Sequence, residues 1–380
     1  MIKFAKPSID KSVLTKIRNI LKSGIFVHGH NTLDFEKKLS NFFKLKSHSI
    51  LSTASCTSAL HLYYISIGIK KGDEVIMSAQ THVATAHAVE ICGAKPVFVD
   101  CELKTGNIDI DRIVEKINDK TACICVTHFL GKPANMFRVL KIAKKNNLKV
   151  VEDTALSIGS KINGKYSGTF GDAGAFSFHP VKIITTGEGG ALILKNKKQY
   201  HLIKSLRSFG YDIADPQERK IPGNYNINYL GLNYRLSEIE AAIGLTELAQ
   251  IKNKILTRKN NYHLLYKKIK SCKNFIILDT GSTKKLSSSY YTLTIILKSR
   301  SKKLRNSLVL KLKEKGIQTS IYYPHPVPLL NYYRKKYNYK LKTFKNANRI
   351  AYNSISFSIA PHIKNKDVKH MSTVIQNLIG

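Results

Sequence analysis

The sequence contains no tryptophan, few cysteines and few acidic residues. Its 380 residues include 6 Cys and 25 Asp or Glu against 62 Lys or Arg, which gives a net charge of +37 at pH 7. The cysteines form no Cys-x-x-Cys pair and no Cys/His cluster with metal-ligand spacing, so the sequence indicates no metal site. Cys123 and Cys125 alternate with Ile124 in a strand-like run, which predicts core packing in a reducing, cytoplasmic setting.

The sequence also lacks long apolar runs. No stretch approaches the roughly 20 apolar residues of a membrane span, and residues 1–7 lack the apolar run of a signal peptide, so we expect a soluble protein.

The excess of Lys and Arg favours acidic ligands and raises nucleic-acid binding as a hypothesis. The cations are spread widely, many at helical surface spacing, and there is no zinc-finger, RNP or KH signature. Lysine-rich genome composition, together with attraction of anionic substrates, is the better explanation. A basic nucleic-acid-binding or regulatory protein remains the non-enzyme alternative.

The length and the pattern of the chain predict a two-domain α/β protein. A chain of 380 residues exceeds the usual size of one domain, and 43% hydrophobic residues suffice for a large core. The first half alternates strands with helices, which favours a mostly parallel sheet flanked by helices. The predicted strands cover residues 74–77, 96–100, 122–126 and 149–151, and the predicted helices cover 57–67, 83–92, 111–117 and 135–146.

The second half changes character. Residues 200–234, with Asp215-Pro216 and Pro222-Gly223-Asn224, predict a loop. Two helices over 236–251 and 252–272 then link a large domain of residues 1–250 to a smaller α+β domain of residues 251–380. The smaller domain is expected to contain strands over 290–297, 318–323 and 354–359 and helices over 303–316 and 368–378.

Lys182 is the most informative single residue. It lies in a loop between a strand that ends at Phe176-Ser177-Phe178 and a strand that opens at residue 191. Most lysines simply extend into solvent. Here, however, Asp153 follows a buried strand, at the edge where α/β sheets bind ligands. A lysine that holds pyridoxal phosphate (PLP) as a Schiff base, and an aspartate that pairs with its pyridine nitrogen, are two parts that a PLP enzyme needs.

A third signal precedes these two along the chain. Ser55, Cys56 and Thr57 stand at the start of a predicted helix, where free N–H groups and hydroxyls suit a phosphate. The alternative is an ordinary helix cap, which Ser and Thr supply in many proteins. The three signals occur together in chain order, which strengthens each of them.

With these residues in place, the chain resembles the nucleotide-sugar aminotransferase family, DegT/StrS type, of fold-type I PLP enzymes. The resemblance runs over almost the whole chain, and Lys182 with Gly187-Glu188-Gly189-Gly190 is its most specific part. It implies an aspartate aminotransferase-like fold. Its other motifs are Phe35-Glu36 after Gly29, Ser55 to Leu60, Gly72 to Ile76, Thr81 to Thr85, Gly93 to Asp100, Glu152-Asp153, Phe176 to Gly190 and Gly231 to Arg235.

The resemblance implies roles for single residues. Lys182 would be the Schiff-base lysine and proton shuttle, and Asp153 the partner of the pyridine nitrogen. Asn233 would reach the cofactor phosphate of a neighbouring subunit, which implies a homodimer with shared active sites. The cofactor phosphate would be held by Ser55, Cys56, Thr57 and Ser177. His82 stands where a ring stacks on the cofactor, although a polar residue at a helix start is an equally plain interpretation.

One position departs from the family pattern. Relatives carry His or Gln three residues after the aspartate, where it hydrogen-bonds the cofactor's ring hydroxyl, and Leu156 cannot do so. Relatives that remove a sugar hydroxyl carry His at the Schiff-base position. Because this chain keeps Lys182, the resemblance favours transamination.

The substrate is predicted only as a class. We expect transfer of an amino group from glutamate to a keto group, at C4 or at C3, of a nucleotide-linked deoxy-sugar in amino-sugar or surface-polysaccharide biosynthesis. A PLP-dependent sugar dehydratase or an aminocyclitol aminotransferase of the same fold is the alternative. Candidate substrate contacts are Tyr323 and His325, which could equally be a strand end and turn, and Arg207, which could equally form a surface ion pair.

Overall fold

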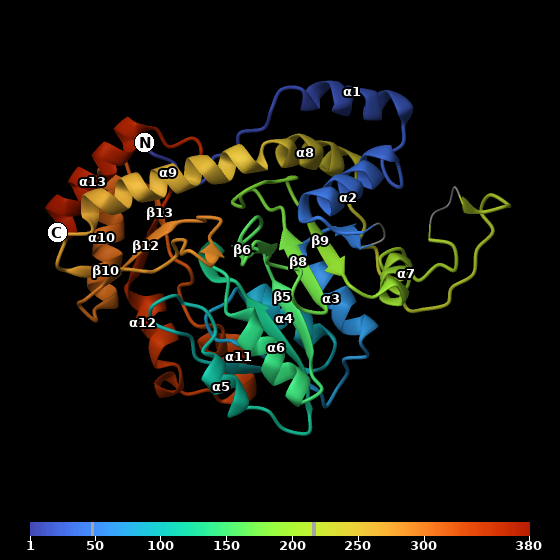
Figure 1. The fold of residues 1–380 in the computed structure, drawn as a ribbon, viewed down its shortest axis with the longest axis horizontal. Helices are drawn as coiled ribbons and strands as arrows, with labels where there is room; N and C mark the ends of the chain where they lie inside the picture. The colour runs from blue at the N-terminus through green and yellow to red at the C-terminus, as the bar shows by residue number, and fades with distance from the viewer. Residues whose placement is uncertain (47–48, 215–217) are drawn as a thin grey trace.

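A seven-stranded sheet forms the centre of the protein (Figure 1). The computed structural model describes residues 1–46, 49–214 and 218–380. The strand order is β1-β9-β8-β5-β4-β2-β3, and only β9 runs antiparallel to its neighbours. The strands are β1 (Ile50–Thr53), β2 (Glu74–Ser78), β3 (Lys95–Val99), β4 (Thr121–Thr127), β5 (Lys149–Asp153), β8 (Ala173–Ser177) and β9 (Gly190–Leu194).

Helices cover both faces of this sheet. In β4, Cys123 and Cys125 pack in one core cluster, whereas Ile124 and Val126 belong to another on the opposite face. This alternation is what a strand buried on both sides requires. The first face is covered by α3 (Cys56–Ser66) and α4 (Val83–Ile91), and the second by α5 (Ile110–Val114) and α6 (Met136–Lys145). The α/β fold with a mostly parallel sheet is therefore confirmed.

A second, antiparallel sheet lies in the C-terminal region, which we define as residues 251–380. Its strands, in the order β10-β12-β14-β13, are β10 (Phe275–Ile277), β12 (Leu293–Leu297), β14 (Ser354–Phe357) and β13 (Thr319–Ser320). Helices α10 (Lys302–Glu314) and α13 (Asn365–Ile379) pack against it in a separate core cluster. The helices α8 (Glu238–Ala249) and α9 (Ile251–Ile269) connect the two sheets along one edge of the molecule (Figure 1).

The domain division at residue 250 stays a prediction. The predicted boundary coincides with the junction of α8 and α9. However, some segments on one side of this boundary in the sequence pack with the other predicted domain. Ile2 pairs with Ile317, so the first residues lie on the C-terminal sheet. Helices α11 (Asn331–Tyr337) and α12 (Lys345–Asn353) contribute Tyr333 and Ile350 to the core cluster of the large sheet.

The predicted loop over 200–234 is wrong at its start. Helix α7 (Lys197–Leu206) occupies residues 200–206, because Tyr200, Ile203 and Leu206 recur at helical spacing and are buried against the large sheet. Asn196 caps this helix by accepting N–H groups from Lys198 and Gln199. The Asp215-Pro216 pair lies outside the described residues.

Several other boundaries also differ. The predicted strands over 290–297, 318–323 and 354–359 are shorter in the structure, and the predicted helix over 111–117 ends at Val114. The patterns did not indicate β1, β10, α11 or α12. They also missed α1 (Val13–Ser23), α2 (His30–Phe43), the 3-10 turns Phe129–Gly131, Val327–Leu329 and Leu341–Thr343, and a small sheet of β6 (Lys161–Ile162), β7 (Lys165–Tyr166) and β11 (Leu286–Ser287). Within the described ranges, no helix is both long and apolar enough to cross a bilayer.

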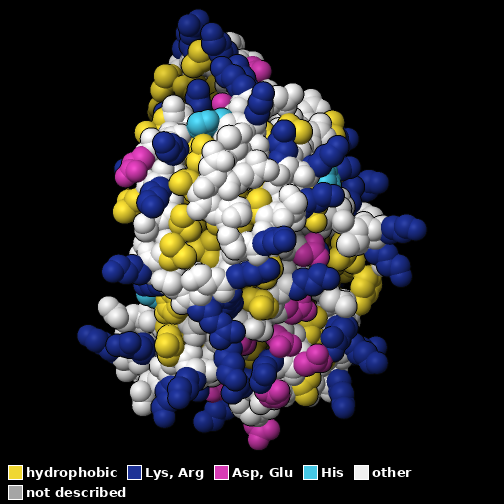
Figure 2. Space-filling model, turned by 90° about the vertical axis from the view of Figure 1, so that its left-hand side faces the viewer, with side chains coloured by type: hydrophobic (Ala, Val, Ile, Leu, Met, Phe, Trp, Pro, Cys, Tyr) yellow, Lys and Arg dark blue, Asp and Glu magenta, His cyan; other side chains and the backbone are white. Residues whose placement is uncertain are grey.

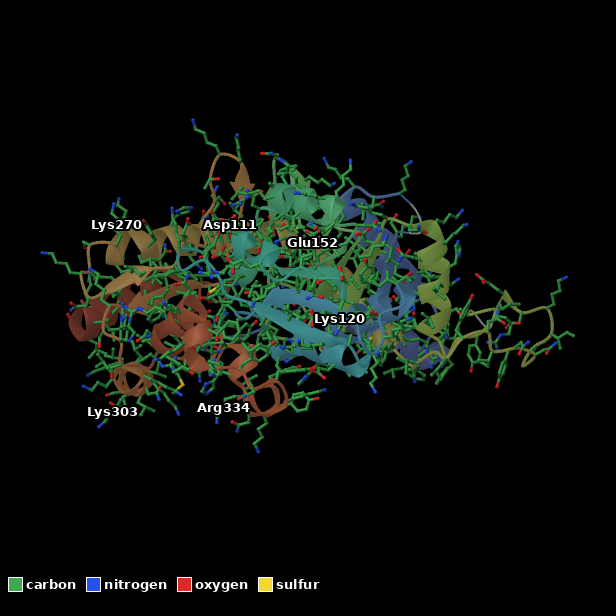
Figure 3. The ribbon with its side chains drawn as sticks, turned by 90° about the horizontal axis from the view of Figure 1, so that it is seen from below. Asp111, Lys120, Glu152, Lys270, Lys303 and Arg334 are labelled. Carbon is green, nitrogen blue, oxygen red and sulfur yellow. The ribbon has the colours of Figure 1, made fainter. Side chains whose placement is uncertain are left out.

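The positive charge is concentrated in one part of the molecule. The C-terminal region holds 28 of the 62 Lys and Arg but only 3 of the 25 Asp and Glu, so the widely spread cations are least balanced by acidic residues here. Figure 2 faces the side of the molecule on which this region lies and shows Lys and Arg over much of its surface. In Figure 3, Lys270 and Lys303 lie at the outside of this region, whereas Glu152 lies near the centre.

Candidate active site

A cavity of about 420 Å³ opens at the carboxyl ends of the parallel strands. Thr127, Asp153 and Ser177 reach it from the last positions of β4, β5 and β8. This edge is where α/β sheets bind their ligands. Of the predicted site residues, the cavity brings together Ser55, Cys56, Thr57, His82, Asp153, Ser177, Lys182 and Tyr323.

Asp153 is a buried carboxylate without a cationic partner. Its side chain is 3% exposed. The Thr85 hydroxyl donates to Oδ2 at 2.7 Å, and the N–H of Ala155 donates to Oδ1 at 3.1 Å. No ion pair to Asp153 occurs among the described residues. A buried negative charge that faces a cavity in this way suits a cationic ring nitrogen.

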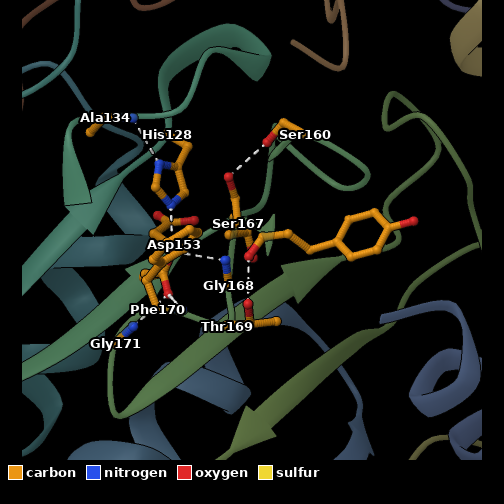
Figure 4. A network of polar contacts seen from close by, with 12 residues as sticks. His128, Ala134, Asp153, Ser160, Ser167, Gly168, Thr169, Phe170 and Gly171 are labelled. Carbon is orange, nitrogen blue, oxygen red and sulfur yellow. Dashed lines mark hydrogen bonds and ion pairs between the residues drawn. The ribbon is translucent and has the colours of Figure 1, made fainter. Parts of the chain in front are cut away.

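Glu152, the neighbour of Asp153, has the opposite surroundings. Figure 4 shows the residues that contact it, among them His128, Gly168 and Gly171, gathered in one network. Glu152 is fully buried beneath the sheet edge and accepts N–H groups from Gly168, Phe170 and Gly171. The imidazole of His128 lies 2.8 Å from its Oε2, and the other ring nitrogen of His128 accepts the N–H of Ala134. The carboxylate of Glu152 is therefore fully engaged by protein groups and holds the loop after β7 in place. Of the two neighbouring carboxylates, Asp153 is the one that can bind a ligand.

Lys182 lies in the loop between β8 and β9. The N–H of Lys182 donates to the carbonyl of His179 at 2.9 Å, which closes a turn and directs the side chain toward the cavity. Its Nζ lies 5.8 Å from the centre of the Tyr291 ring, and the Tyr291 hydroxyl donates to the carbonyl of Val181 at 3.0 Å. Burial lowers the pKa of Lys182 from its ordinary value. The amine is therefore more easily neutral than that of a surface lysine.

The start of α3 forms the wall opposite the lysine. Ser55 caps the helix, since its hydroxyl accepts the N–H of Ser58 at 3.0 Å. Gly190, the first residue of β9, approaches this turn so closely that a Cβ atom there would lie 2.4 Å from the carbonyl carbon of Ser55. Only glycine permits this contact, which holds the helix start against the sheet. The N–H groups of Cys56 and Thr57 lie in the first turn, where α-helices bind phosphate.

This donor set fits PLP. The cavity offers a lysine amine, a carboxylate free of cationic partners and a helix start flanked by the Ser177 hydroxyl. Burial, followed by the charge of Asp153, raises the pKa of the Cys56 thiol well above its ordinary value, so the thiol stays protonated. Its sulfur lies 4.0 Å from Oδ1 of Asp153.

His82, Tyr323 and Leu156 also line the cavity. His82 caps α4 through its ring nitrogen, and its ring lies edge-on to Tyr323 with 5.4 Å between the centres. Leu156 is 2% exposed and lines the cavity, so it supplies an apolar surface where a hydrogen-bonding side chain was expected.

Three predicted residues lie outside the cavity. Arg207 is buried in an ion pair with Glu36 at 2.7 Å and also donates to the carbonyl of Ser52. His325 contacts the hydroxyl of Tyr352 at 3.4 Å. Asn233 is exposed on the surface of the single chain. Conversely, sequence reasoning gave no role to Thr85, Gly190 or Tyr291. Thr85 and Gly190 belong to motifs that carry the family resemblance, Thr81 to Thr85 and Phe176 to Gly190. No pattern near Tyr291 in the sequence indicates that it lies beside Lys182.

Comparisons with known proteins agree with this geometry. The model of the DegT/DnrJ/EryC1/StrS aminotransferase family matches residues 7–376. The GDP-perosamine synthase of Escherichia coli O157:H7 is 33% identical over 340 residues, 88% of this chain and 87% of the relative. The GDP-4-keto-6-deoxy-D-mannose 3-dehydratase of Yersinia pseudotuberculosis is 30% identical over 335 residues, 84% of each chain.

The solved structure of Helicobacter pylori PseC, an aminotransferase involved in the biosynthesis of pseudoaminic acid, superposes with a TM-score of 0.92 at 26% identity. The match covers 100% of this chain and 99% of that one. The chain therefore belongs to the DegT/DnrJ/EryC1/StrS aminotransferase family and is a PLP-dependent aminotransferase.

Proposed function

We propose that this enzyme transfers an amino group from glutamate to the C4 keto group of a nucleotide-linked deoxy-sugar, in the cytoplasm. The observation that carries the proposal is the placement of Lys182 and the unpaired carboxylate of Asp153 in one cavity. In this proposal Lys182 holds the cofactor covalently, and Ser55, Cys56, Thr57 and Ser177 hold its phosphate.

PLP supplies an electron sink for the bond broken at the donor's α-carbon. Asp153 keeps a proton on the ring nitrogen by its charge, and Thr85 and Ala155 fix the orientation of its carboxylate. Asp153 ends β5 and Thr85 lies in the first turn of α4, and regular elements hold a charge more rigidly than a loop does. Leu156 packs apolar surface into the cavity and excludes water on that side.

Lys182 moves the proton in this proposal. With the cofactor bound, the free amine of Lys182 would take the proton from the donor's α-carbon and would hold it for return, which is the proton-shuttle role proposed for this residue. The amine must be neutral to take a proton. Burial lowers the pKa of Lys182 and so favours its neutral form. Two hydrogen bonds limit how far the amine can move. The backbone N–H of Lys182 donates to the carbonyl of His179, and the Tyr291 hydroxyl donates to the carbonyl of Val181.

The relatives support the sugar class. One is named a GDP-perosamine synthase, and the name of another gives a GDP-linked 4-keto-6-deoxy sugar as its substrate. The second relative is a dehydratase, so identity alone does not separate the two reactions. Retention of Lys182, where the family's dehydrating members carry histidine, favours amino transfer. Tyr323, which lines the cavity beside His82, is the proposed sugar contact.

The test is incubation of the PLP-loaded enzyme with glutamate and a panel of nucleotide-linked 4-keto and 3-keto sugars. Replacement of C=O by CH–NH₂ changes the mass of the sugar product, and we expect it for a 4-keto-6-deoxy acceptor. Loss of the sugar hydroxyl without a gain of nitrogen would assign the enzyme to dehydration instead.

We further propose that the enzyme is a homodimer in which Asn233 completes the partner's site. Asn233 is exposed, and the segment before it exposes large apolar side chains, with Tyr229 48% and Leu230 92% exposed. Figure 1 shows this segment extending away from the body of the molecule at the right. An exposed apolar extension of this kind fits a surface covered by a second copy.

Mixing two defective subunits tests the shared site. Asn233→Asp places a negative charge beside the partner's phosphate, and Lys182→Ala removes the covalent anchor, so each variant alone should be inactive. Co-expression should restore activity, because a hybrid dimer contains one site with both native residues. We expect up to half the native activity per hybrid. Co-expressed variants that remain as inactive as the separate ones would contradict the proposal.

A further inference from the structure

A second cavity, of about 560 Å³, lies in the C-terminal region and has no assigned role. It is formed by the turn Leu341–Thr343, helix α12 and the segment that leads into α10. It shares no lining residue with the cavity that holds Lys182. Its volume falls within the range of about 300–1,000 Å³ that is usual for small-molecule sites.

The described residues that line the cavity include five cations and no acidic residue. The cations are Arg300, Lys302, Lys342, Lys345 and Arg349. None of them forms an ion pair with a carboxylate in the part of the chain that the structure describes. Five positive charges without a counter-charge repel one another, and an anion in the cavity would relieve that repulsion.

Two of these cations are held in place. The guanidinium of Arg349 donates to the carbonyls of Leu297 and Lys298, each at 2.7 Å. The Nζ of Lys302 lies 5.1 Å from the centre of the Tyr352 ring. The carboxylate of Asp100, which touches this region, is engaged elsewhere, because it accepts the N–H groups of Asn346 and Ala347 and so caps α12.

The N-terminus of α10 adds to the positive potential. This helix of 13 residues begins at Lys302, and its cap residue Ser301 accepts the N–H of Leu304 at 3.1 Å. The first N–H groups of a helix have no partner within the helix and favour a phosphate. Arg300 and Lys302 flank this end and both line the cavity.

Two buried amide oxygens point to a ligand with hydrogen-bond donors. Asn353 is 4% exposed, and Asn348 is half-buried. Both line the cavity, and neither side-chain oxygen has a hydrogen-bond partner among the residues that the structure describes. Their amide nitrogens are already used, since Asn353 donates to the carbonyl of Arg349 and Asn348 to that of Leu341. A buried acceptor without a donor is unfavourable, so a hydroxyl or N–H of a ligand would be favourable here.

We propose that this cavity binds a nucleoside or sugar phosphate, with its phosphates on the five cations and its hydroxyls on Asn348 and Asn353. Inorganic phosphate or a polyanion such as nucleic acid would satisfy the cations alone. A phosphorylated molecule that carries hydroxyls satisfies both sets of groups. The site is separate from Lys182, so the proposal does not depend on the proposed sugar reaction.

The test uses the PLP-loaded enzyme and UDP as the probe, with binding measured by calorimetry and located by hydrogen-exchange mass spectrometry. The cavity variant carries Lys302→Gln, Lys342→Gln and Lys345→Gln. The control variant removes the same charge from exposed residues that do not line the cavity, through Lys303→Gln, Lys311→Gln and Lys335→Gln. Thermal unfolding checks that both variants are folded.

We expect UDP to protect peptides that cover residues 298–304 and 341–353 from exchange. The cavity variant should lose that protection and bind at this site at least about tenfold more weakly, while the control variant stays within about twofold of the native enzyme. Asn353→Ala should weaken UDP but leave pyrophosphate binding unchanged.

Three outcomes would overturn the proposal. Equal losses in the cavity and control variants would show a diffuse charge effect, as for nucleic acid. Protection confined to peptides around Lys182 would show that UDP binds only in the active site. Equal affinities for UDP and pyrophosphate, both unaffected by Asn353→Ala, would reduce the cavity to a site for simple anions.

Discussion

Replacing Lys182 with alanine should reduce turnover by at least about 10⁴-fold. The substitution removes both the amine that holds the cofactor and the base that moves the proton, and the two losses act on the same reaction. No other lysine lines the cavity among the described residues, so none can replace it. The measurement is the steady-state rate with glutamate and a keto-sugar, together with the visible absorbance of the lysine-bound cofactor.

A surface lysine serves as the control for this substitution. Lys198 is exposed on α7, and Lys198→Ala should leave both the rate and the absorbance unchanged. Lys182→Ala should unfold at a temperature close to that of the native apoenzyme, since no hydrogen bond to its Nζ is found within the described ranges. A Lys182→Ala enzyme that keeps the absorbance and more than a tenth of the rate would refute the assignment.

Replacing Asp153 with asparagine should lower turnover by about 10³-fold while the enzyme still binds the cofactor. The amide keeps the shape of the carboxylate. Its one oxygen can still accept the N–H of Ala155, while its NH₂ group replaces the other carboxylate oxygen and donates to the Thr85 hydroxyl, but the amide carries no charge to hold a proton on the ring nitrogen. Removal of one preorganised electrostatic contact has effects of about this size. A decrease in rate of less than about tenfold would contradict the role given to Asp153.

Glu152 provides a matched control for Asp153. Glu152→Gln makes the same chemical change one residue earlier, but there it disrupts a fully buried carboxylate bonded to His128 and to three backbone N–H groups. We expect a loss of about 3 kcal/mol in the free energy of unfolding, measured by denaturant titration. Asp153→Asn should change the free energy of unfolding by much less. Equal destabilisation by the two variants would mean that both carboxylates are structural.

The cavity residues that could be predicted are those whose local sequence pattern indicates their place in the fold. Asp153 ends a buried run, Ser55 precedes a helix, and Lys182 sits between two strands, so each could be assigned from a window of a few residues. The same holds for β2, β3, β4 and β5 of the large sheet, which are largely apolar runs separated by helices.

The remaining residues depend on contacts between distant parts of the chain. The partner of Asp153 is Thr85, which lies 68 residues earlier, and Tyr291 contacts Val181 across 110 residues. Arg207 lies outside the cavity because it pairs with Glu36, which is 171 residues away in the sequence. The clustering of cations around the second cavity also depends on the fold, since Arg300 and Lys345 are separated in the sequence by α10, β13 and α11.

The measurement that tests amino transfer most directly uses the PLP-loaded enzyme with glutamate alone. We predict that the visible absorbance of the lysine-bound cofactor is replaced by that of pyridoxamine phosphate, with release of one 2-oxoglutarate per active site, and that Lys182→Ala shows neither change. An enzyme that binds PLP but leaves both the absorbance and the glutamate unchanged, with every other common amino acid giving the same result, would contradict the account.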